Sequence, residues 1–92
     1  MPELQLLTEL QLALLSILWE RQEASTAEIC EALKPERILA HTTVATLLSR
    51  LERRGVVSHR KNGRHYIYRP MVSQADVKRS MVSELTEALF GT

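Results

Sequence analysis

The sequence predicts a mainly α-helical domain with one small β-hairpin: three helices, a two-stranded hairpin and a further C-terminal helix. Three observations carry this prediction. Apolar residues recur at helical spacing in segments 9–21, 26–33 and 40–54. The period then changes to alternation around Asn62-Gly63, and a fourth-residue repeat returns near the C-terminus. A chain of 92 residues is one small domain that can bury a modest core.

Composition narrows the class of protein. A single cysteine, Cys30, excludes an internal disulfide and a multi-cysteine zinc site, and it fits a reducing compartment. The longest apolar-rich run, Leu10 to Trp19, is interrupted by polar residues and is too short to span a bilayer. The N-terminus has no basic stretch of the kind that opens a signal peptide. We therefore expect a cytoplasmic protein with no membrane attachment, no metal and no cofactor.

The first helix, predicted over residues 9–21, has a clear start signal. Thr8 can cap it, Gln11 three residues later completes a capping box, and Leu7 can pack against Leu12. Trp19 lies beside the leucine stripe and is expected inside the protein rather than stacked on a base. The apolar stripe consists of Leu10, Leu14, Ile17 and Leu18.

The second helix is short. Ser25 and Glu28 form another capping box, and the helix runs to Leu33, where Pro35 disfavours its continuation. Cys30 lies close to the inward side and is interpreted as a small buried hydrophobe, with redox sensing as the alternative.

The segment from Ala40 to Gly55 predicts a helix with two contrasting faces. The apolar face consists of Val44, Leu47, Leu48 and Leu51. The opposite face carries hydroxyls and guanidiniums from Thr42, Thr46, Ser49 and Arg53, with Arg50 on its flank. Such groups can approach a phosphodiester backbone and base edges, so we interpret this helix as a recognition helix.

The hairpin is predicted from Asn62-Gly63 as a two-residue loop between alternating strands. That loop would pair Lys61 with Arg64, His59 with Tyr66, and Val57 with Tyr68. Two cations facing each other repel, which suggests an anionic partner at the tip. The alternative is a solvated turn, and the pattern leaves open which face of the hairpin is buried.

After Pro70, Ser73 resembles the cap of a last helix. Its apolar residues recur every fourth position at Val77, Met81, Leu85 and Leu89, and we expect them to form a subunit contact. Packing on the same domain is the alternative. On this basis the chain divides into a DNA-binding domain, residues 1–72, and the start of a dimerisation region, residues 73–92.

Charge is distributed unevenly although the formal net charge is only +1. The segment from Lys34 to Arg69 holds nine lysines and arginines and two acids, a net +7, and the remainder carries −6. This segregation favours a polyanionic partner, although charged runs also occur on ordinary solvated surfaces.

Two helices joined by a brief turn, followed by a hairpin, are the arrangement of a winged helix-turn-helix. In this order the sequence resembles the penicillinase-repressor (BlaI/MecI/CopY) family of bacterial transcriptional regulators. The resemblance covers nearly all of residues 7–73. It is carried by the stretches LTELQLALLSILWE, EICEALKPER, AHTTVATLLSRLERRGVV and KNGRHYIYRPMVS.

The resemblance implies a homodimeric repressor on palindromic operators of β-lactamase, methicillin-resistance or copper-homeostasis genes. In that family, release follows cleavage by a sensor metalloprotease or metal binding at a cysteine motif. The C-terminal cysteine pairs of the copper branch are absent here, and the family usually continues for some tens of residues past Thr92. We therefore expect either a DNA-binding portion or a short member that dimerises through its last helix, and carry over no cleavage mechanism.

Sequence-specific binding of duplex DNA is thus the leading functional prediction. The alternative is a protein-interaction winged helix without nucleic acid. An enzyme is disfavoured because His41, His59 and His65 show no metal or catalytic-triad spacing. The predicted DNA-binding residues are His41, Thr42, Thr43, Thr46, Ser49, Arg50, Arg53, Lys61, Asn62 and Arg64.

Overall fold

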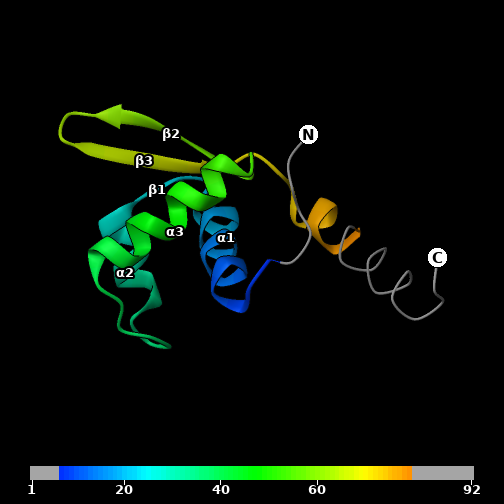
Figure 1. Ribbon diagram of the computed structural model, residues 1–92, viewed down its shortest axis with the longest axis horizontal. Coiled ribbons are helices and arrows are strands. Elements are labelled where there is room, and N and C mark those ends of the chain that lie inside the picture. Colours follow the sequence, from blue (N-terminus) through cyan, green and yellow to red (C-terminus); the bar gives the residue numbers. More distant parts are fainter. Residues whose placement is uncertain (1–6, 80–92) are drawn as a thin grey trace.

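The computed structural model describes residues 7–79 (Figure 1). Its elements are α1 (Glu9–Arg21), β1 (Ala24–Ser25), α2 (Thr26–Leu33), α3 (His41–Arg53), β2 (Val57–Asn62) and β3 (His65–Pro70). Residues 74–79 are helical as well. The three labelled helices form one body, and the β2–β3 hairpin extends beyond it as a wing. The predicted winged helix-turn-helix fold is therefore confirmed.

Reciprocal capping boxes begin α1 and α2, as the sequence predicts. Thr8 Oγ1 accepts from the Gln11 amide at 3.1 Å, and Gln11 Oε1 accepts from the Thr8 amide at 3.0 Å. Ser25 and Glu28 exchange the equivalent bonds at 3.1 and 2.9 Å. Each box satisfies two amides that a helix start otherwise leaves unpaired.

The helical segment 74–79 begins in the same way. Ser73 Oγ accepts from the Asp76 amide at 3.0 Å, and the Asp76 carboxylate accepts from the Ser73 amide at 3.1 Å. The hydrogen bond from the Ser73 amide, with a smaller effect of the Ser73 hydroxyl, lowers the pKa of Asp76. The predicted cap at Ser73 is confirmed.

The core lies where the helices meet the base of the hairpin. Leu14, Leu15 and Leu18 of α1 are fully buried, and so is Ile29 of α2. From α3 the buried residues are Val44, Leu48 and Leu51, which are three of the four predicted apolar positions, while Leu47 is half-buried. Burial of such aliphatic side chains contributes about 1.5–3 kcal/mol each before entropy is counted.

The chain beyond the hairpin remains attached to this core. Trp19 Nε1 donates to the Val72 carbonyl at 2.9 Å, and the ring is packed against the core rather than offered to a ligand. Val72 and Val77 are both buried, with Val77 only 2% exposed. The packing of the winged-helix domain therefore reaches at least to Val77.

A third strand was not predicted. Residues 24–25 form β1, which pairs antiparallel with β3 by Ala24↔Tyr68 and Ser25↔Ile67, giving a sheet of order β1-β3-β2. A strand of two residues is too short to show an alternating pattern in the sequence. It can be recognised only from its pairing with β3. The sheet joins the wing to the start of α2, since Ser25 is also the cap of that helix.

The predicted register of the hairpin is wrong by two residues. Asn62 pairs with His65, Lys61 with Tyr66 and His59 with Tyr68, so the two-residue loop is Gly63-Arg64. Gly63 has a φ of 65°, and Gln22 is the only non-glycine residue with positive φ in the part of the chain described. A two-residue turn with glycine in its first central position needs a positive φ only at that glycine, whereas the predicted Asn62-Gly63 loop needs a positive φ at both residues.

The shift has two consequences. A change of two residues leaves every side chain on its predicted face, so His59 and His65 still point to opposite sides of the hairpin. The expected face-to-face repulsion between Lys61 and Arg64, however, does not occur. Lys61 lies instead 5.9 Å from the centre of the Tyr66 ring, a cation–π contact. The buried face is the one that carries Val57 and Tyr68.

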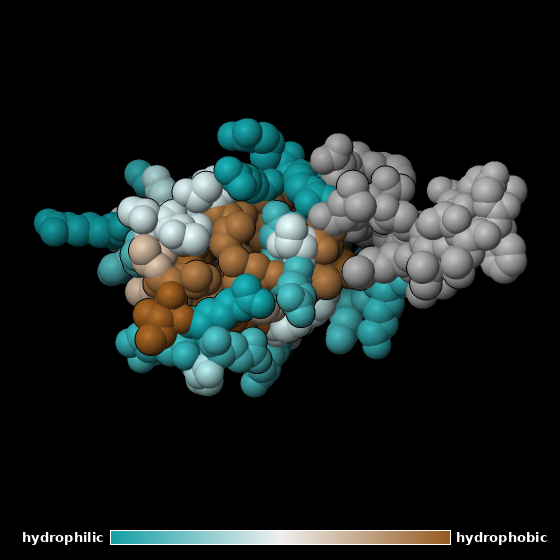
Figure 2. Space-filling model, turned by 60° about the horizontal axis from the view of Figure 1, so that its bottom comes forward, coloured by the Kyte–Doolittle hydropathy of each residue, from teal (hydrophilic) through white to brown (hydrophobic). Residues whose placement is uncertain are grey.

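A few large hydrophobic side chains stay exposed. Ile38, in the α2–α3 connection at the bottom of Figure 1, is 85% exposed. Figure 2 turns that side forward and shows hydrophobic surface bordered by hydrophilic side chains. Within residues 7–79, no helix has the length and apolar character needed to cross a membrane.

Candidate nucleic-acid interface

The outer face of α3 collects most of the predicted binding residues. All seven of them on this helix are exposed, because the opposite face is occupied by the buried stripe. They are His41, Thr42, Thr43, Thr46, Ser49, Arg50 and Arg53. The first turn carries no acid, and Arg50 and Arg53 lie in the last turn, where cations complement the helix dipole. The face is therefore hydroxyl-rich at its start and cationic at its end.

One hydroxyl on this face already has a partner. Thr46 Oγ1 donates to the Thr42 carbonyl one turn earlier at 2.9 Å. That bond uses the only proton of the hydroxyl, so Thr46 can still accept but cannot donate without breaking it. A contact from Thr46 to an acceptor such as a phosphate is accordingly disfavoured, and its methyl group suits the C5-methyl of thymine.

The start of α3 differs from that of the other helices. Ala40 is its N-cap, and no side chain accepts a hydrogen bond from the first amides. The helix end is conventional, since Gly55 follows with a φ of 78°.

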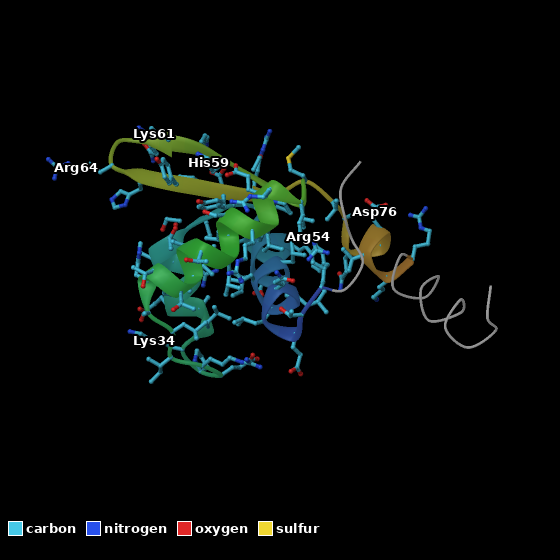
Figure 3. The ribbon with its side chains drawn as sticks, viewed as in Figure 1. Lys34, Arg54, His59, Lys61, Arg64 and Asp76 are labelled. Carbon is cyan, nitrogen blue, oxygen red and sulfur yellow. The ribbon has the colours of Figure 1, made fainter. Side chains whose placement is uncertain are left out.

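The wing presents the other predicted residues. Lys61, Asn62 and Arg64 are all exposed. Figure 3 shows Arg64 projecting outward from the tip and Lys61 on the same end of the hairpin. Lys61 is on a strand and Arg64 is in the turn, so the two cations point apart rather than toward each other. The tip is a cationic point suited to phosphates.

A cleft of about 340 Å³ lies between the wing and α3. The side contributed by α3 consists of His41, Ala45 and Ser49. The wing contributes Arg64, His65, Tyr66 and Tyr68, and the start of α2 closes the end with Ser25, Thr26 and Ala27. Burial, with a smaller effect of the Glu52 charge, raises the pKa of Tyr68, so this phenol stays neutral.

The cleft adds residues that the sequence did not indicate. His65, Tyr66 and the start of α2 lie next to predicted residues only because the sheet brings them there. Alternation within residues 64–69 marks a strand but does not show which helix faces it. No local signal could have identified this group.

Two polar side-chain contacts tie the wing to the helical body. His59 Nδ1 lies 2.6 Å from Glu52 Oε2 of α3. Arg60, on the other face of β2, donates to Glu23 Oε1 at 2.9 Å. Since Glu23 lies just before β1, the base of the wing is held from both sides.

The predicted dimerisation residues divide into two groups. Val77 is buried in the core of its own domain, so its side chain is already covered. Met81, Leu85 and Leu89 lie outside the described residues.

Comparison with known proteins decides the family. The model of the penicillinase repressor family matches residues 7–92. The chain belongs to this family. The match covers the winged-helix domain and continues through the C-terminal segment.

Two curated relatives illustrate the relationship. The transcriptional regulator BlaI of Mycobacterium tuberculosis is 36% identical over 90 residues, which is 96% of this chain and 65% of that protein. The penicillinase repressor of Bacillus licheniformis is 25% identical over 76 residues, 83% of this chain and 59% of that protein. The chain therefore spans about three-fifths of the length of these relatives.

Solved structures agree with the fold. The solution structure of the DNA-binding domain of the repressor BlaI matches with a TM-score of 0.71 and 25% identity, covering 83% of this chain and 93% of that one. The monomeric form of Bacillus licheniformis BlaI in complex with the blaP half-operator matches with a TM-score of 0.66, at the same identity and coverage.

Proposed function

We propose that this chain binds duplex DNA sequence-specifically and represses transcription. The observation that carries the proposal is the outer face of α3, where every predicted position is exposed, beside a wing whose tip is cationic. Membership of the penicillinase repressor family and the likeness to a BlaI domain that was solved with a half-operator support it.

Each part of the surface has a distinct role. Thr42, Thr43 and Thr46 face the floor of the major groove, with threonine methyls against thymine. Arg50 reads a base edge or grips a phosphate, and Arg53 holds the backbone. Lys61, Asn62 and Arg64 on the wing hold the flanking backbone without reading sequence. Because the Lys34–Arg69 segment carries +7, the approach of DNA is electrostatically favoured.

A dimer on a palindromic operator completes the proposal. Two copies of α3 must be spaced by about one turn of DNA, which requires a contact outside the reading surface. Met81, Leu85 and Leu89 supply that contact, and residues 73–92 begin the dimerisation region. The targets are β-lactamase, methicillin-resistance or related genes, by analogy with the family.

The test is selection from randomised duplex DNA. The chain is sedimented with and without the pool, and the retained DNA is sequenced. We expect an enriched motif, a two-to-one protein-to-duplex ratio, and affinity that falls steeply between about 50 and 200 mM salt. Retention of no motif together with a flat salt response would overturn the proposal. Capture of a protein partner that survives nuclease treatment would then favour an interaction module.

A further inference from the structure

Glu52 occupies an unusual place in the charge pattern. It is the only acidic residue between Glu36 and Asp76, a segment that otherwise carries the cations of α3 and the wing. A carboxylate at this position adds a negative charge among these cations and weakens their attraction for phosphates. Something must offset that charge if the surface binds DNA.

His59 of β2 is the partner of this carboxylate. The two atoms Nδ1 and Oε2 are 2.6 Å apart, and the side chains are 32% and 35% exposed, so the pair is partly shielded from water. Figure 3 shows His59 on the wing where it passes over the helical body. The contact joins the wing directly to the recognition helix.

The imidazole is also held by aromatic rings. Its centroid lies 4.6 Å from that of Tyr66 and 5.4 Å from that of Tyr68. Lys61, on the same face of the hairpin, places its Nζ over the ring of Tyr66. A ring packed in this way has few alternative rotamers, so the direction of Nδ1 is fixed by the wing itself.

Other charges near His59 do not compete for it. The titratable or charged groups around it are Glu52 from α3, Tyr66 and Tyr68 from β3, and Lys61 from its own strand. A small cleft on the other side adds Glu23, Arg60 and Arg69. Glu23 is paired with Arg60 at 2.9 Å, which leaves Glu52 as the carboxylate that contacts the imidazole.

We propose that Glu52 and His59 act as a charge-dependent clamp that positions the wing against α3 for DNA binding. The inference rests on the proposed function and adds a positioning pair to it. Neither side chain needs to touch DNA. The contact between the imidazole and the Glu52 carboxylate fixes the position of the cationic tip relative to the reading helix.

Binding of the selected duplex by the full chain tests the clamp in a double-mutant cycle. Glu52→Gln keeps an oxygen that accepts a hydrogen bond but removes the charge. We expect it to weaken binding by about two- to fivefold, the range for a partly exposed contact to a charged group. In a His59→Gln background the same change should instead leave affinity unchanged or raise it, because only a repulsive carboxylate is removed.

His65→Gln is the matched control, since His65 lies on the opposite face of the same hairpin. The effect of Glu52→Gln should be the same in this background as in the wild type. If Glu52→Gln tightens binding equally in all backgrounds, Glu52 is merely a repulsive charge and the clamp is wrong.

A readout without DNA separates this inference from the proposed function. The effects of Glu52→Gln and His59→Gln on the thermal unfolding midpoint should be coupled, so that the double variant loses less stability than the sum of the two single variants. Absence of duplex binding with this coupling intact would refute the function and retain the clamp. Duplex binding without coupling between Glu52 and His59 in either assay would support the proposed function and refute the clamp.

Discussion

The scaffold helices and the recognition helix treat their N-termini in opposite ways. The starts of α1, α2 and residues 74–79 are closed by reciprocal side-chain bonds from Thr8, Ser25 and Ser73. The start of α3 is Ala40, with no side-chain cap and no acid in its first turn. The first turns of the scaffold helices are therefore closed by side chains of the chain itself, whereas the first turn of α3 has no side-chain cap.

This difference has an energetic meaning. A side-chain cap contributes about 1 kcal/mol to the free energy of unfolding, and α3 lacks this contribution. At an uncapped helix start the first amides have no side-chain acceptor. The partial positive charge of the helix end then favours an anion. Stability and binding should accordingly depend on different residues, and substitutions can test that separation.

The largest expected effect is on the binding side. Arg50→Ala should cost about 1–3 kcal/mol of duplex affinity and relax the preference at one base position. Because Arg50 is exposed and outside the core, the midpoint of thermal unfolding should hardly move. Fluorescence anisotropy with the selected duplex and its single-base variants measures the first quantity, and a thermal melt measures the second. A large loss of stability would contradict the separation.

The complementary change lies in the scaffold. Ser25→Ala removes the cap of α2 and should lower the free energy of unfolding by about 1 kcal/mol. Urea titration measures it. Affinity for DNA, measured well below the unfolding transition, should change little, and Ser25→Thr should restore most of the stability. A selective loss of binding with unchanged unfolding would show that the start of α2 contacts DNA.

Adding a side-chain cap at the start of α3 should change stability and DNA affinity in opposite directions in one variant. Ala40→Asp supplies the missing cap, so stability should rise by about 0.5–1 kcal/mol. The added charge lies where phosphate is expected, and duplex affinity should fall by about as much or more. Ala40→Ser is the uncharged control: it should gain stability with a smaller loss of affinity. Tighter binding by the aspartate variant would place DNA away from this end.

Substitutions in the wing should change affinity to a similar degree for all DNA sequences. Lys61→Ala or Arg64→Ala should weaken all sequences alike and reduce the slope of log affinity against log salt by about one per contact. Anisotropy at several salt concentrations provides that slope. Asn62→Ala, which removes no charge, should leave it unchanged. An effect restricted to the preferred motif would mean that the wing reads bases.

The smallest expected effect is on the stability of the folded protein at low pH. Hydrogen bonds from Ser25, first from its backbone and then from its side chain, lower the pKa of Glu28 from its ordinary value of 4.5. A lowered pKa in the folded state contributes stability above that value, and the contribution is lost as pH falls through the folded pKa. Glu28→Gln, which can still accept from the Ser25 amide, should show a shallower acid-side loss of stability. An unchanged acid limb in urea titrations would assign that loss to other carboxylates.

Local signals account for what the sequence predicted well. The capping boxes at Thr8 and Ser25 place two helix starts to the residue, because a cap and its partner are three positions apart. The apolar stripe of α3 likewise identifies both its buried and its exposed faces. These features need no knowledge of the rest of the chain.

The failures of prediction concern the pairing of strands and the contacts that this pairing creates. Strand β1 exists only because Ala24 and Ser25 meet β3, and the cleft residues His65 and Tyr66 face α3 only in the folded sheet. The hairpin register was wrong because Asn62-Gly63 and Gly63-Arg64 can both form two-residue turns, and the local sequence does not distinguish between them.

The bond from Trp19 to the Val72 carbonyl gives the molecule an optical reporter. Trp19 is the sole tryptophan, and its indole marks the point where the chain leaves the hairpin for its C-terminal helix. Indole emission shifts with polarity and hydrogen bonding, so the intrinsic fluorescence of this protein reports on that junction without any label. Movement of the C-terminal segment on binding or release of DNA should be visible as a change in the emission maximum.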